Sequence, residues 1–497
     1  MPYSTELLLI GSVLLFFSLF WERFSKRFEV PVLFLFLILG MLVGSNGMGR
    51  IHFDNPDSAH LIGMLALAII LFSGGMDAKF REVKPVILPS VLLSTLGVLL
   101  TALFTGLFIY WITTQFFITH KLTFFESLLL ASVIASTDFA LVFAILRSKG
   151  LRLKHNLRPL LELESGSNDV MAYLLMITFL QLVQAQNSSA TFAVGMFFYE
   201  LIVGALCGYF LGKLAVKIIN RVKMSNDALY PILLLAISFI IFLLTDIVHG
   251  SGFLAVYLGG LTIGNSRFLH KRSTINFFDG FAWLAQFLMF FTFGMLIKPL
   301  ELLPVAGFGL AVGIFIILLG RPLAVLTCIP FFKKIPAKAK IYVSWVGLRG
   351  AVPLIFATYI LASDIENARL MFNVVFFIML TSLLIQGTSV SVVAKWLKLG
   401  ENGDKEHDHL SEHGAELPHE TKTAMTEIVV IEEHLKNGNS LVNMNIPEYT
   451  LVVMVKRGEH YFVPKGNTEI EVGDVLYMIS NDDRTMRISH RKMGIRY

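Results

Sequence analysis

Long apolar runs recur along most of the chain and are separated by short polar or charged loops. Each run is long enough to cross roughly 30 Å of hydrocarbon as a helix, and we count about thirteen of them in chain order. They cover residues 5–22, 30–46, 60–76, 86–113, 123–146, 158–184, 191–213, 228–247, 251–265, 277–297, 303–328, 341–361 and 370–394. The pattern predicts a polytopic α-helical membrane protein whose transmembrane domain covers residues 1–396.

The distribution of basic residues predicts the orientation of these runs. Loops after odd-numbered runs carry about 22 Lys and Arg, whereas loops after even-numbered runs carry about four, and cytoplasmic loops are the ones enriched in such residues. The first run lacks a basic stretch before it, so it is expected to span the membrane rather than to be a cleaved signal. We expect a multi-pass protein of the cell (inner) membrane, with the N-terminus outside and the segment after Lys398 in the cytoplasm.

The pattern changes abruptly at about Leu399. Residues 397–424 are polar and acidic and contain Gly and Pro, which predicts a solvated linker. Residues 425–497 show short alternating apolar runs between turn residues, and the expected strands are TEIVVI, SLVNMNI, TLVVMVKRG, HYFVPKG and DVLYMIS. We expect a small α+β cytoplasmic domain that is stabilised by dimerisation.

Composition excludes several classes of protein. Hydrophobic residues make up 55% and charged residues 15% of the 497 positions, and the mean hydropathy is +0.69. Soluble proteins have about a quarter charged residues, so this chain is not one of them. The net charge of +5 is too small to indicate nucleic-acid binding. Cys207 and Cys328 lie far apart, and neither GxxxxGK[ST] nor HExxH is present, so we expect no enzyme and no cofactor.

The sixth run contains six residues, ESGSND from Glu164 to Asp169, that put ionisable and polar side chains into an apolar stretch. A charge in hydrocarbon costs several kcal/mol, so such residues are usually functional. Ser165 and Asp169 are four residues apart, as are Glu164 and Asn168, so the two pairs lie on adjoining helix faces. Their oxygens suit a monovalent cation, and a carboxylate can also take a proton.

Other charged residues are expected at the same depth. At 1.5 Å per residue, Asp169 and Asp138 lie roughly 18 and 14 Å from the cytoplasmic ends of their runs. Arg321 and Arg349 lie at roughly 16 and 12 Å in the eleventh and twelfth runs. These side chains should therefore converge near the midplane. Asp138 and Asp169 are the favoured ion-binding residues, whereas Glu164 is expected to pair with an arginine.

Two runs are interrupted by residues that disfavour a continuous helix. The fifth breaks at residues 136–138, and the twelfth breaks at Gly347, Gly350 and Pro353. If runs 1–6 and 8–13 are two inverted repeats, each break falls in the fifth helix of its repeat. Broken helices at such positions are typical of secondary transporters, in which unwound backbone and helix ends contact the ion.

Two functions fit this pattern. A secondary antiporter that exchanges K⁺ or Na⁺ for H⁺ needs one carboxylate that binds the proton and the cation in turn. The alternative is a ligand-gated monovalent cation channel, although no filter sequence of the TVGYG kind is present. A titratable site near the midplane favours exchange. The pattern does not choose between K⁺ and Na⁺, because both ions use the same ligand types.

Four motifs resemble the signatures of the NhaP-type sodium/proton and potassium/proton exchangers of bacteria and archaea. They are STD at 136–138, ESGSND at 164–169, GRP at 320–322 and GLRGAVP at 347–353. The resemblance covers nearly all of residues 1–396. It implies a homodimer in the lipid bilayer, in which a core bundle moves against a dimerisation bundle and gives the site alternating access.

The resemblance also implies which residues bind the ion. Asp169 would bind the cation or the proton. Thr137, Asp138 and Ser165 would help to coordinate the cation. The transported ions would thus be K⁺, Na⁺ and H⁺.

The same resemblance implies supporting roles for neighbouring residues. Asn168 would stabilise the crossing of the broken helices. Because electrogenic relatives have a second Asp at that position, Asn168 also implies electroneutral, one-for-one exchange. Glu164 would form a structural ion pair with either Arg321 or Arg349.

The segment from Asn439 to Ser480 resembles the C-terminal ligand-binding subdomain of potassium-conductance regulators, the RCK_C or TrkA-C type. Exchangers that carry such a domain are usually assigned as potassium/proton antiporters, so the resemblance implies K⁺ transport regulated by residues 425–497. It also allows a regulatory nucleotide, such as a cyclic dinucleotide, at a dimer interface. No Gly-rich phosphate loop is present in this segment.

Overall fold

The computed structural model describes most of the chain. The described residues are 32–44, 55–116, 121–184, 190–222, 226–328, 335–363, 365–402, 425–435, 438–444, 450–458 and 460–480, with the single positions 12, 13, 16, 53, 224 and 446. The chain divides into two compact units, Met1–Gly403 and Asp404–Tyr497.

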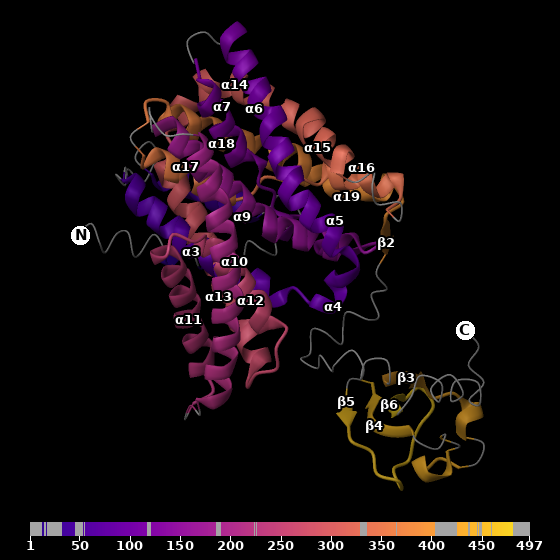
Figure 1. The fold of residues 1–497 in the computed structure, drawn as a ribbon. Coiled ribbons are helices and arrows are strands. Elements are labelled where there is room, and N and C mark those ends of the chain that lie inside the picture. The colour runs from indigo at the N-terminus through magenta and orange to yellow at the C-terminus, as the bar shows by residue number, and fades with distance from the viewer. Residues whose placement is uncertain are drawn as a thin grey trace. The chain divides into compact units, whose positions relative to one another are not determined.

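The first unit is almost entirely helical where it is described (Figure 1). Its helices are α2 (Val32–Val43), α3 (Pro56–Asp77), α4 (Phe80–Val83), α5 (Ile87–Leu92), α6 (Val98–Gln115), α7 (Phe124–Ala135), α8 (Phe139–Ser148), α9 (Leu157–Gln184), α10 (Ala190–Arg221), α11 (Leu229–Ile247), α12 (Gly252–Gly264), α13 (Lys271–Leu296), α14 (Pro299–Phe315), α15 (Arg321–Cys328), α16 (Ala337–Trp345), α17 (Val352–Leu361), α18 (Ala368–Ser382) and α19 (Thr388–Trp396). Short π-helical turns join α5 to α6, α14 to α15 and α18 to α19. They cover Leu93–Gly97, Ile316–Gly320 and Leu383–Gly387.

Eight helical stretches within the described ranges are long and apolar enough to cross a membrane. They are Pro56–Asp77, Phe80–Gln115, Leu157–Gln184, Thr191–Arg221, Leu229–Ile247, Lys271–Leu296, Pro299–Cys328 and Ala368–Trp396. Shorter apolar helices, α2, α7, α12 and α17, lie in the second, fifth, ninth and twelfth predicted runs. The predicted helical membrane protein is therefore confirmed. The run 5–22 lies largely outside the described residues, so the count of thirteen and the inverted repeats stay predictions.

Helices α2, α3 and α10 to α13 pack into one group, and α10 to α13 run side by side in Figure 1. Glycines allow their backbones to touch. A Cβ at Gly264 of α12 would overlap the backbone of Met76 in α3. A Cβ at Gly294 of α13 would lie 2.8 Å from Cα of Gly40 in α2. Contacts this close interlock the helices, since neither side chain nor lipid separates them.

The helices from α5 to α9 and from α14 to α19 form a second group, which carries the predicted site. Within this group α9 packs against α7 and α5, and α18 packs against α14 and α17. The two groups meet mainly where α17 contacts α3 and where α9 contacts α10 and α12. Helix α9, which carries residues 164–169, thus contacts the interlocked group directly.

A short antiparallel sheet connects the loop before α9 with the residues after α19. Strand β1 (Leu151–Leu153) pairs with β2 (Gly400–Asn402), with Leu151 opposite Asn402. The predicted linker 397–424 therefore does not begin as a solvated segment, because Leu397 and Leu399 are buried and residues 400–402 form a strand. Residues 403–424 lie outside the described ranges.

The second unit contains a four-stranded antiparallel sheet of order β3-β6-β4-β5. Its strands are β3 (Met425–Val429), β4 (Thr450–Arg457), β5 (His460–Phe462) and β6 (Val475–Ser480). Four of the five predicted strands are present. Side chains of the sheet form a separate small core, which includes Val455, Leu476 and Met478 together with Val430 just after β3. The predicted α+β character and the likeness to a potassium-conductance regulator stay predictions.

The predicted strand SLVNMNI is wrong. Residues Leu441–Asn443 form a 3₁₀ turn, in which Val442 is exposed. The backbone N–H of Leu441 donates to the carbonyl of Thr468, and the N–H of Val442 donates to the carbonyl of Gly466. The segment therefore bonds to a turn rather than to a neighbouring strand, although its alternating sequence favours a strand.

A buried carboxylate joins the ends of the two central strands of this sheet, β6 and β4. Asp474 is 2% exposed and accepts hydrogen bonds from Nε and Nη2 of Arg457 at 2.9 and 2.7 Å. It also accepts one from the backbone N–H of Glu471 at 2.9 Å. The hydrogen bonds from Arg457 hold the pKa of Asp474 below its ordinary value.

We expect Arg457→Met to destabilise the sheet by about 2 kcal/mol, because charge-assisted hydrogen bonds contribute roughly 1.5–3 kcal/mol. Hydrogen exchange of the amides of residues 450–480 in the full chain measures this. The extra stability of the wild-type sheet over Arg457→Met should be fully present above the ordinary pKa of an Asp carboxyl. It should be lost as pH falls through the lowered pKa of Asp474. Lys465→Met, at an exposed position, is the control. Equal exchange in Arg457→Met and wild type would contradict the anchoring role.

Candidate functional site

Two broken helices cross at the centre of the site. The first break, residues 136–138, separates α7 from α8, and the second, residues 346–351, separates α16 from α17. The backbone N–H of Asp138 donates to the carbonyl of Leu348 at 2.7 Å, which joins the two breaks. Gly350 permits this approach, since a Cβ there would overlap the carboxylate of Asp138. Both breaks lie where the sequence predicts them.

Charged side chains complement the helix ends that meet at the crossing. The guanidinium of Arg349 donates from Nε to the carbonyl of Ile134, in the last turn of α7, at 3.2 Å. Its Nη1 donates to the carbonyl of Gly347, just after α16, at 2.6 Å. Asp138 caps α8, because its Oδ1 accepts from the N–H of Leu141 at 3.2 Å. Each charge therefore has the sign that stabilises the helix end it touches.

Asp169 points from α9 toward the first break. Its side chain is 8% exposed, and Oδ1 accepts a hydrogen bond from the hydroxyl of Ser136 at 2.5 Å. Asp138 and Glu164 are its charged neighbours. No Lys or Arg within the described ranges forms an ion pair with Asp169. Its second carboxylate oxygen remains available to a proton or a cation.

Ser165 fastens α9 to both sides of the break. Its hydroxyl accepts from the N–H of Phe139 at 3.0 Å and donates to the carbonyl of Thr137 at 2.8 Å. Phe139 is the first residue of α8. One hydroxyl therefore satisfies an unpaired donor at the start of α8 and an unpaired acceptor in the extended segment before it.

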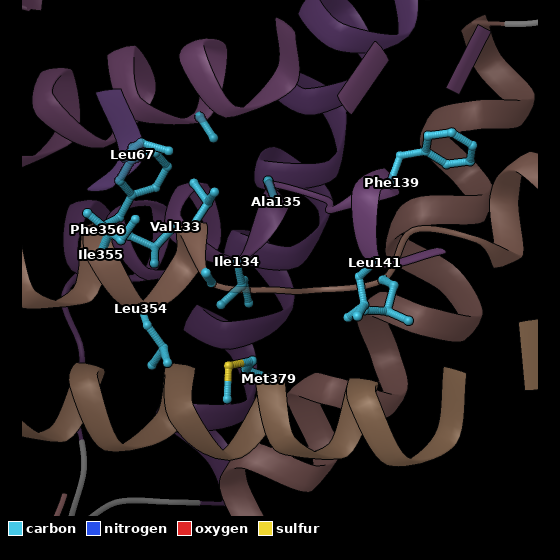
Figure 2. Close-up of a cluster of buried hydrophobic side chains, with 14 of the residues drawn as sticks. Leu67, Val133, Ile134, Ala135, Phe139, Leu141, Leu354, Ile355, Phe356 and Met379 are labelled. Carbon is cyan, nitrogen blue, oxygen red and sulfur yellow. The ribbon is translucent and has the colours of Figure 1, made fainter. Parts of the chain in front are cut away.

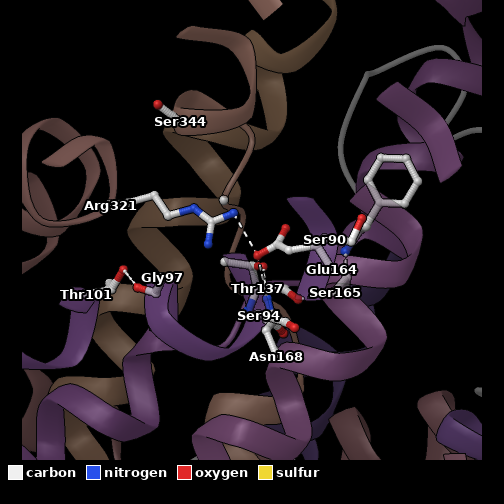
Figure 3. A network of polar contacts seen from close by, with 12 residues as sticks. Ser90, Ser94, Gly97, Thr101, Thr137, Glu164, Ser165, Asn168, Arg321 and Ser344 are labelled. Carbon is white, nitrogen blue, oxygen red and sulfur yellow. Dashed lines mark hydrogen bonds and ion pairs between the residues drawn. The ribbon is translucent and has the colours of Figure 1, made fainter. Parts of the chain in front are cut away.

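Asn168 joins Thr137 and Glu164 in the polar network of Figure 3. Its amide nitrogen donates to the hydroxyl of Thr137 and, at 3.1 Å, to Oε1 of Glu164. Its amide oxygen lies 3.5 Å from the backbone nitrogen of Thr137. Both N–H donors of Asn168 are thus used to hold the first break and Glu164 in place.

Glu164 pairs with Arg321 rather than with Arg349. The distance from Nη2 of Arg321 to Oε1 of Glu164 is 2.9 Å, and both side chains are 2% exposed (Figure 3). Arg321 directly follows the π-helical turn Ile316–Gly320. Arg349 does not pair with Glu164 but donates to backbone carbonyls. Residue spacing leaves this choice open, and the packing of α15 against the crossing decides it.

Apolar side chains from both broken helices surround the crossing. Figure 2 shows them gathered from α3, α7, α8, α17 and α18, and they include Leu67, Val133, Ile134, Leu354, Phe356 and Met379. This shell keeps the effective dielectric low, so that electrostatic interactions among the site residues are stronger than they would be in water. Among the described residues no cluster of His, Cys, Asp or Glu could hold a metal ion of the zinc type.

The structure brings together the residues predicted to form the site: Thr137, Asp138, Glu164, Ser165, Asn168, Asp169, Arg321 and Arg349. It adds Ser136, which the sequence indicates only as part of the helix break, yet it is the residue that hydrogen-bonds Asp169. A hydroxyl side chain at the end of a broken helix is the signal that could have identified it.

The fold and the site together define a multi-pass membrane protein with a buried carboxylate beside crossed helix breaks. Residues 12–396 match the transmembrane domain of the sodium/hydrogen exchangers. The chain belongs to this family.

The similarity extends over most of the chain in known relatives. The K(+)/H(+) antiporter NhaP of Alkalimonas amylolytica is 40% identical over 397 residues, which is 80% of this chain and 67% of that protein. The K(+)/H(+) antiporter NhaP2 of Shewanella sp. (strain MR-4) is 34% identical over 484 residues, which is 97% of this chain and 82% of that protein. The sodium proton antiporter MjNhaP1 from Methanocaldococcus jannaschii has the same fold, with a TM-score of 0.68 at 23% identity over 80% of this chain and 99% of that one.

We expect Glu164→Ala to lower the free energy of unfolding by about 3–5 kcal/mol, because it leaves the charge of Arg321 buried without its partner. The double variant Glu164→Leu/Arg321→Met should recover much of this loss, since well-packed apolar residues replace a buried ion pair at little cost. Thermal unfolding in detergent, followed by tryptophan fluorescence, measures both.

The pair of Arg369 and Glu301, whose side chains are 30% and 40% exposed, provides the control. Glu301→Ala should lower stability less than Glu164→Ala does, by about 1–2 kcal/mol, because the ion pair is partly exposed but Glu301 also accepts a hydrogen bond from the buried Asn373. If Glu164→Ala melts like Glu301→Ala, the buried pair does not stabilise the crossing.

Proposed function

We propose that this protein is a secondary antiporter that exchanges K⁺ for H⁺ at Asp169. The observation that carries the proposal is the setting of this carboxylate. Asp169 is buried at the crossing and receives one hydroxyl from Ser136, whereas the nearby Glu164 is already neutralised by Arg321. A buried carboxylate without its own cation favours taking up a mobile one.

Exchange follows from competition for that carboxylate. A proton and an alkali cation cannot both occupy Asp169, so each time the site changes from one side of the membrane to the other it carries one of them. Oxygens close to it could complete the shell of a dehydrated cation: Asp138 and the hydroxyls or carbonyls of Ser136, Thr137 and Ser165. If the group of α5–α9 and α14–α19 moves against the interlocked group of α2, α3 and α10–α13, the site opens to each side in turn.

The choice of K⁺ rests on relatives. NhaP and NhaP2 are named K(+)/H(+) antiporters, and NhaP2 aligns over 97% of this chain, which includes the second unit. Sodium is the proposed competing substrate. Both ions bind oxygen ligands, and they differ in the size of the coordination shell that each needs.

We also propose the features that the family resemblance implies. The protein works as a homodimer in the bilayer, with its N-terminus outside and residues 425–497 in the cytoplasm. Exchange is electroneutral, because Asn168 stands beside Asp169 where a second carboxylate would carry another charge. The cytoplasmic domain regulates transport and binds a nucleotide, for which a cyclic dinucleotide is the first ligand to try.

We expect Asp169→Asn to abolish exchange while the protein stays folded, because the amide cannot take a proton or neutralise a cation. The assay uses proteoliposomes that hold a pH dye and have the membrane potential clamped at zero. Addition of K⁺ should move protons in wild type more strongly than addition of Na⁺. Clamping at other potentials should leave the rate unchanged if exchange is electroneutral.

Asp227→Asn is the matched control, because Asp227 is exposed and lies near His270, away from the crossing. It should exchange like wild type. Full exchange in Asp169→Asn would contradict the single-carboxylate mechanism. Potassium flux that follows voltage without proton movement would show a channel instead.

A further inference from the structure

The second helix break is held by two polar side chains that the proposed ion site does not use. Ser382 ends α18, and Gln386 lies in the π-helical turn Leu383–Gly387 that follows. Both side chains are fully buried. Single π-helical turns inside long helices are uncommon and occur frequently at functional sites.

These two side chains bond to both ends of the break. The backbone N–H of Arg349 donates to the hydroxyl of Ser382 at 3.0 Å, and this hydroxyl donates to Oε1 of Gln386 at 2.6 Å. Nε2 of Gln386 donates to the carbonyl of Trp345, the last residue of α16, at 2.8 Å. The pair therefore closes a loop of hydrogen bonds around residues 345–349.

The position of Leu348 and Arg349 matters directly to the proposed site. The carbonyl of Leu348 accepts from the N–H of Asp138, and the guanidinium of Arg349 reaches across to the end of α7. A shift of residues 345–349 would therefore move Asp138 and the neighbouring break. Ser165 and Asn168 hold the first break from α9 in the same way, each by bonds to residues 137–139.

We propose that Ser382 and Gln386 are positioning residues for ion exchange, which act by fixing the backbone of residues 345–349. The proposal rests on the proposed antiport at Asp169. Loss of either side chain leaves a buried N–H or carbonyl unpaired in the break, and the break then relaxes toward other partners. The consequence should be altered ion affinity and pH dependence rather than loss of the fold alone.

The test compares hydroxyl and amide variants in the proteoliposome assay. Ser382→Ala and Gln386→Met should each raise the apparent KM for K⁺, on the order of tenfold, which corresponds to one lost buried hydrogen bond. Each should also shift the pH at half-maximal rate. The double variant should be no worse than the poorer single variant, because the two residues act as one unit.

Two controls separate positioning from packing. Ser382→Thr keeps the hydroxyl and should restore the wild-type KM. Thr381→Val removes a neighbouring buried hydroxyl that bonds only within its own helix, to the carbonyl of Phe377, and should leave KM and the pH profile unchanged. Wild-type KM and pH profile in folded Ser382→Ala and Gln386→Met would overturn the proposal. An inactive wild type would instead contradict the proposed antiport.

An independent feature lies near the end of the first unit. Strand β2 ends at Asn402, beside the boundary at Gly403 where the first unit ends, and it pairs with β1 in the loop between α8 and α9. Lys154 continues the pairing, since its N–H donates to the carbonyl of Leu399 at 3.0 Å. Leu151 and Leu399 are buried, so the strand pair is fixed to the first unit.

This strand pair lies next to both helices that carry the site carboxylates. Helix α8 begins directly after Asp138, and α9 carries Glu164 and Asp169. The chain that leads to the second unit is therefore attached to the group of helices that holds the site, not to the interlocked group. We infer, on the basis of the proposed regulation of transport by the second unit, that the strand pair transmits this regulation to the connection between α8 and α9.

Proline substitutions on either strand test this inference in the full chain. Arg152 and Glu401 face each other in the register, and proline cannot donate to the ladder. Arg152→Pro and Glu401→Pro should shift the pH profile of exchange by the same amount, because each breaks the same pairing. Arg152→Ala and Glu401→Ala keep the backbone donors and should match wild type.

Glu401→Pro is the decisive variant, because it leaves the sequence of the α8–α9 loop unchanged. A wild-type profile in that variant would overturn the inference, even if Arg152→Pro is altered through local disruption of the loop. Loss of exchange in wild type would again be a failure of the proposed antiport and not of the strand pair.

Discussion

Unpaired backbone groups in a membrane are the constraint on which this structure depends. Each helix break leaves backbone N–H and C=O groups without their helical partners. The bilayer interior holds no water that could bond to them, and each unsatisfied group costs several kcal/mol. The two breaks therefore bond to each other through Asp138 and Leu348, and the remaining groups bond to Ser165, Arg349 and Ser382. Most of the conspicuous polar residues of the membrane region are explained by this requirement before any ion is considered.

The unpaired backbone groups also provide partners for the charged side chains at the crossing. Arg349 is held by the carbonyl ends of α7 and α16, Asp138 caps α8, and Glu164 is neutralised by Arg321. Asp169 differs, since it accepts a hydrogen bond from the neutral hydroxyl of Ser136. A carboxylate in that setting is stabilised by binding a proton or a cation. The proposed exchange is thus a consequence of how the other charges are already balanced.

The interlocked helices and the site helices differ in how they pack. Gly264 and Gly294 bring backbones of the first group into direct contact, whereas the site group is joined at its centre by hydrogen bonds across unwound segments. Direct backbone contact resists sliding, and hydrogen-bonded breaks can exchange partners. In the proposed alternating access, this contrast favours the site group as the moving part, and β2 pairs with the loop between two helices of that group.

The sequence by itself determined the helical membrane class and both helix breaks, and it predicts the candidate site residues that the structure gathers at the crossing, apart from Ser136. Length, hydropathy and the spacing within ESGSND report depth along each helix and the face of that helix, and both are local properties of the chain. Only the tertiary structure decided that Glu164 pairs with Arg321, that Ser136 bonds to Asp169, and that residues 400–402 form a strand. Spacing fixes neither the rotation of one helix about its axis relative to another nor the partner of a short polar segment. Those choices are made when the helices pack, because only then do the buried donors and acceptors of distant segments face one another.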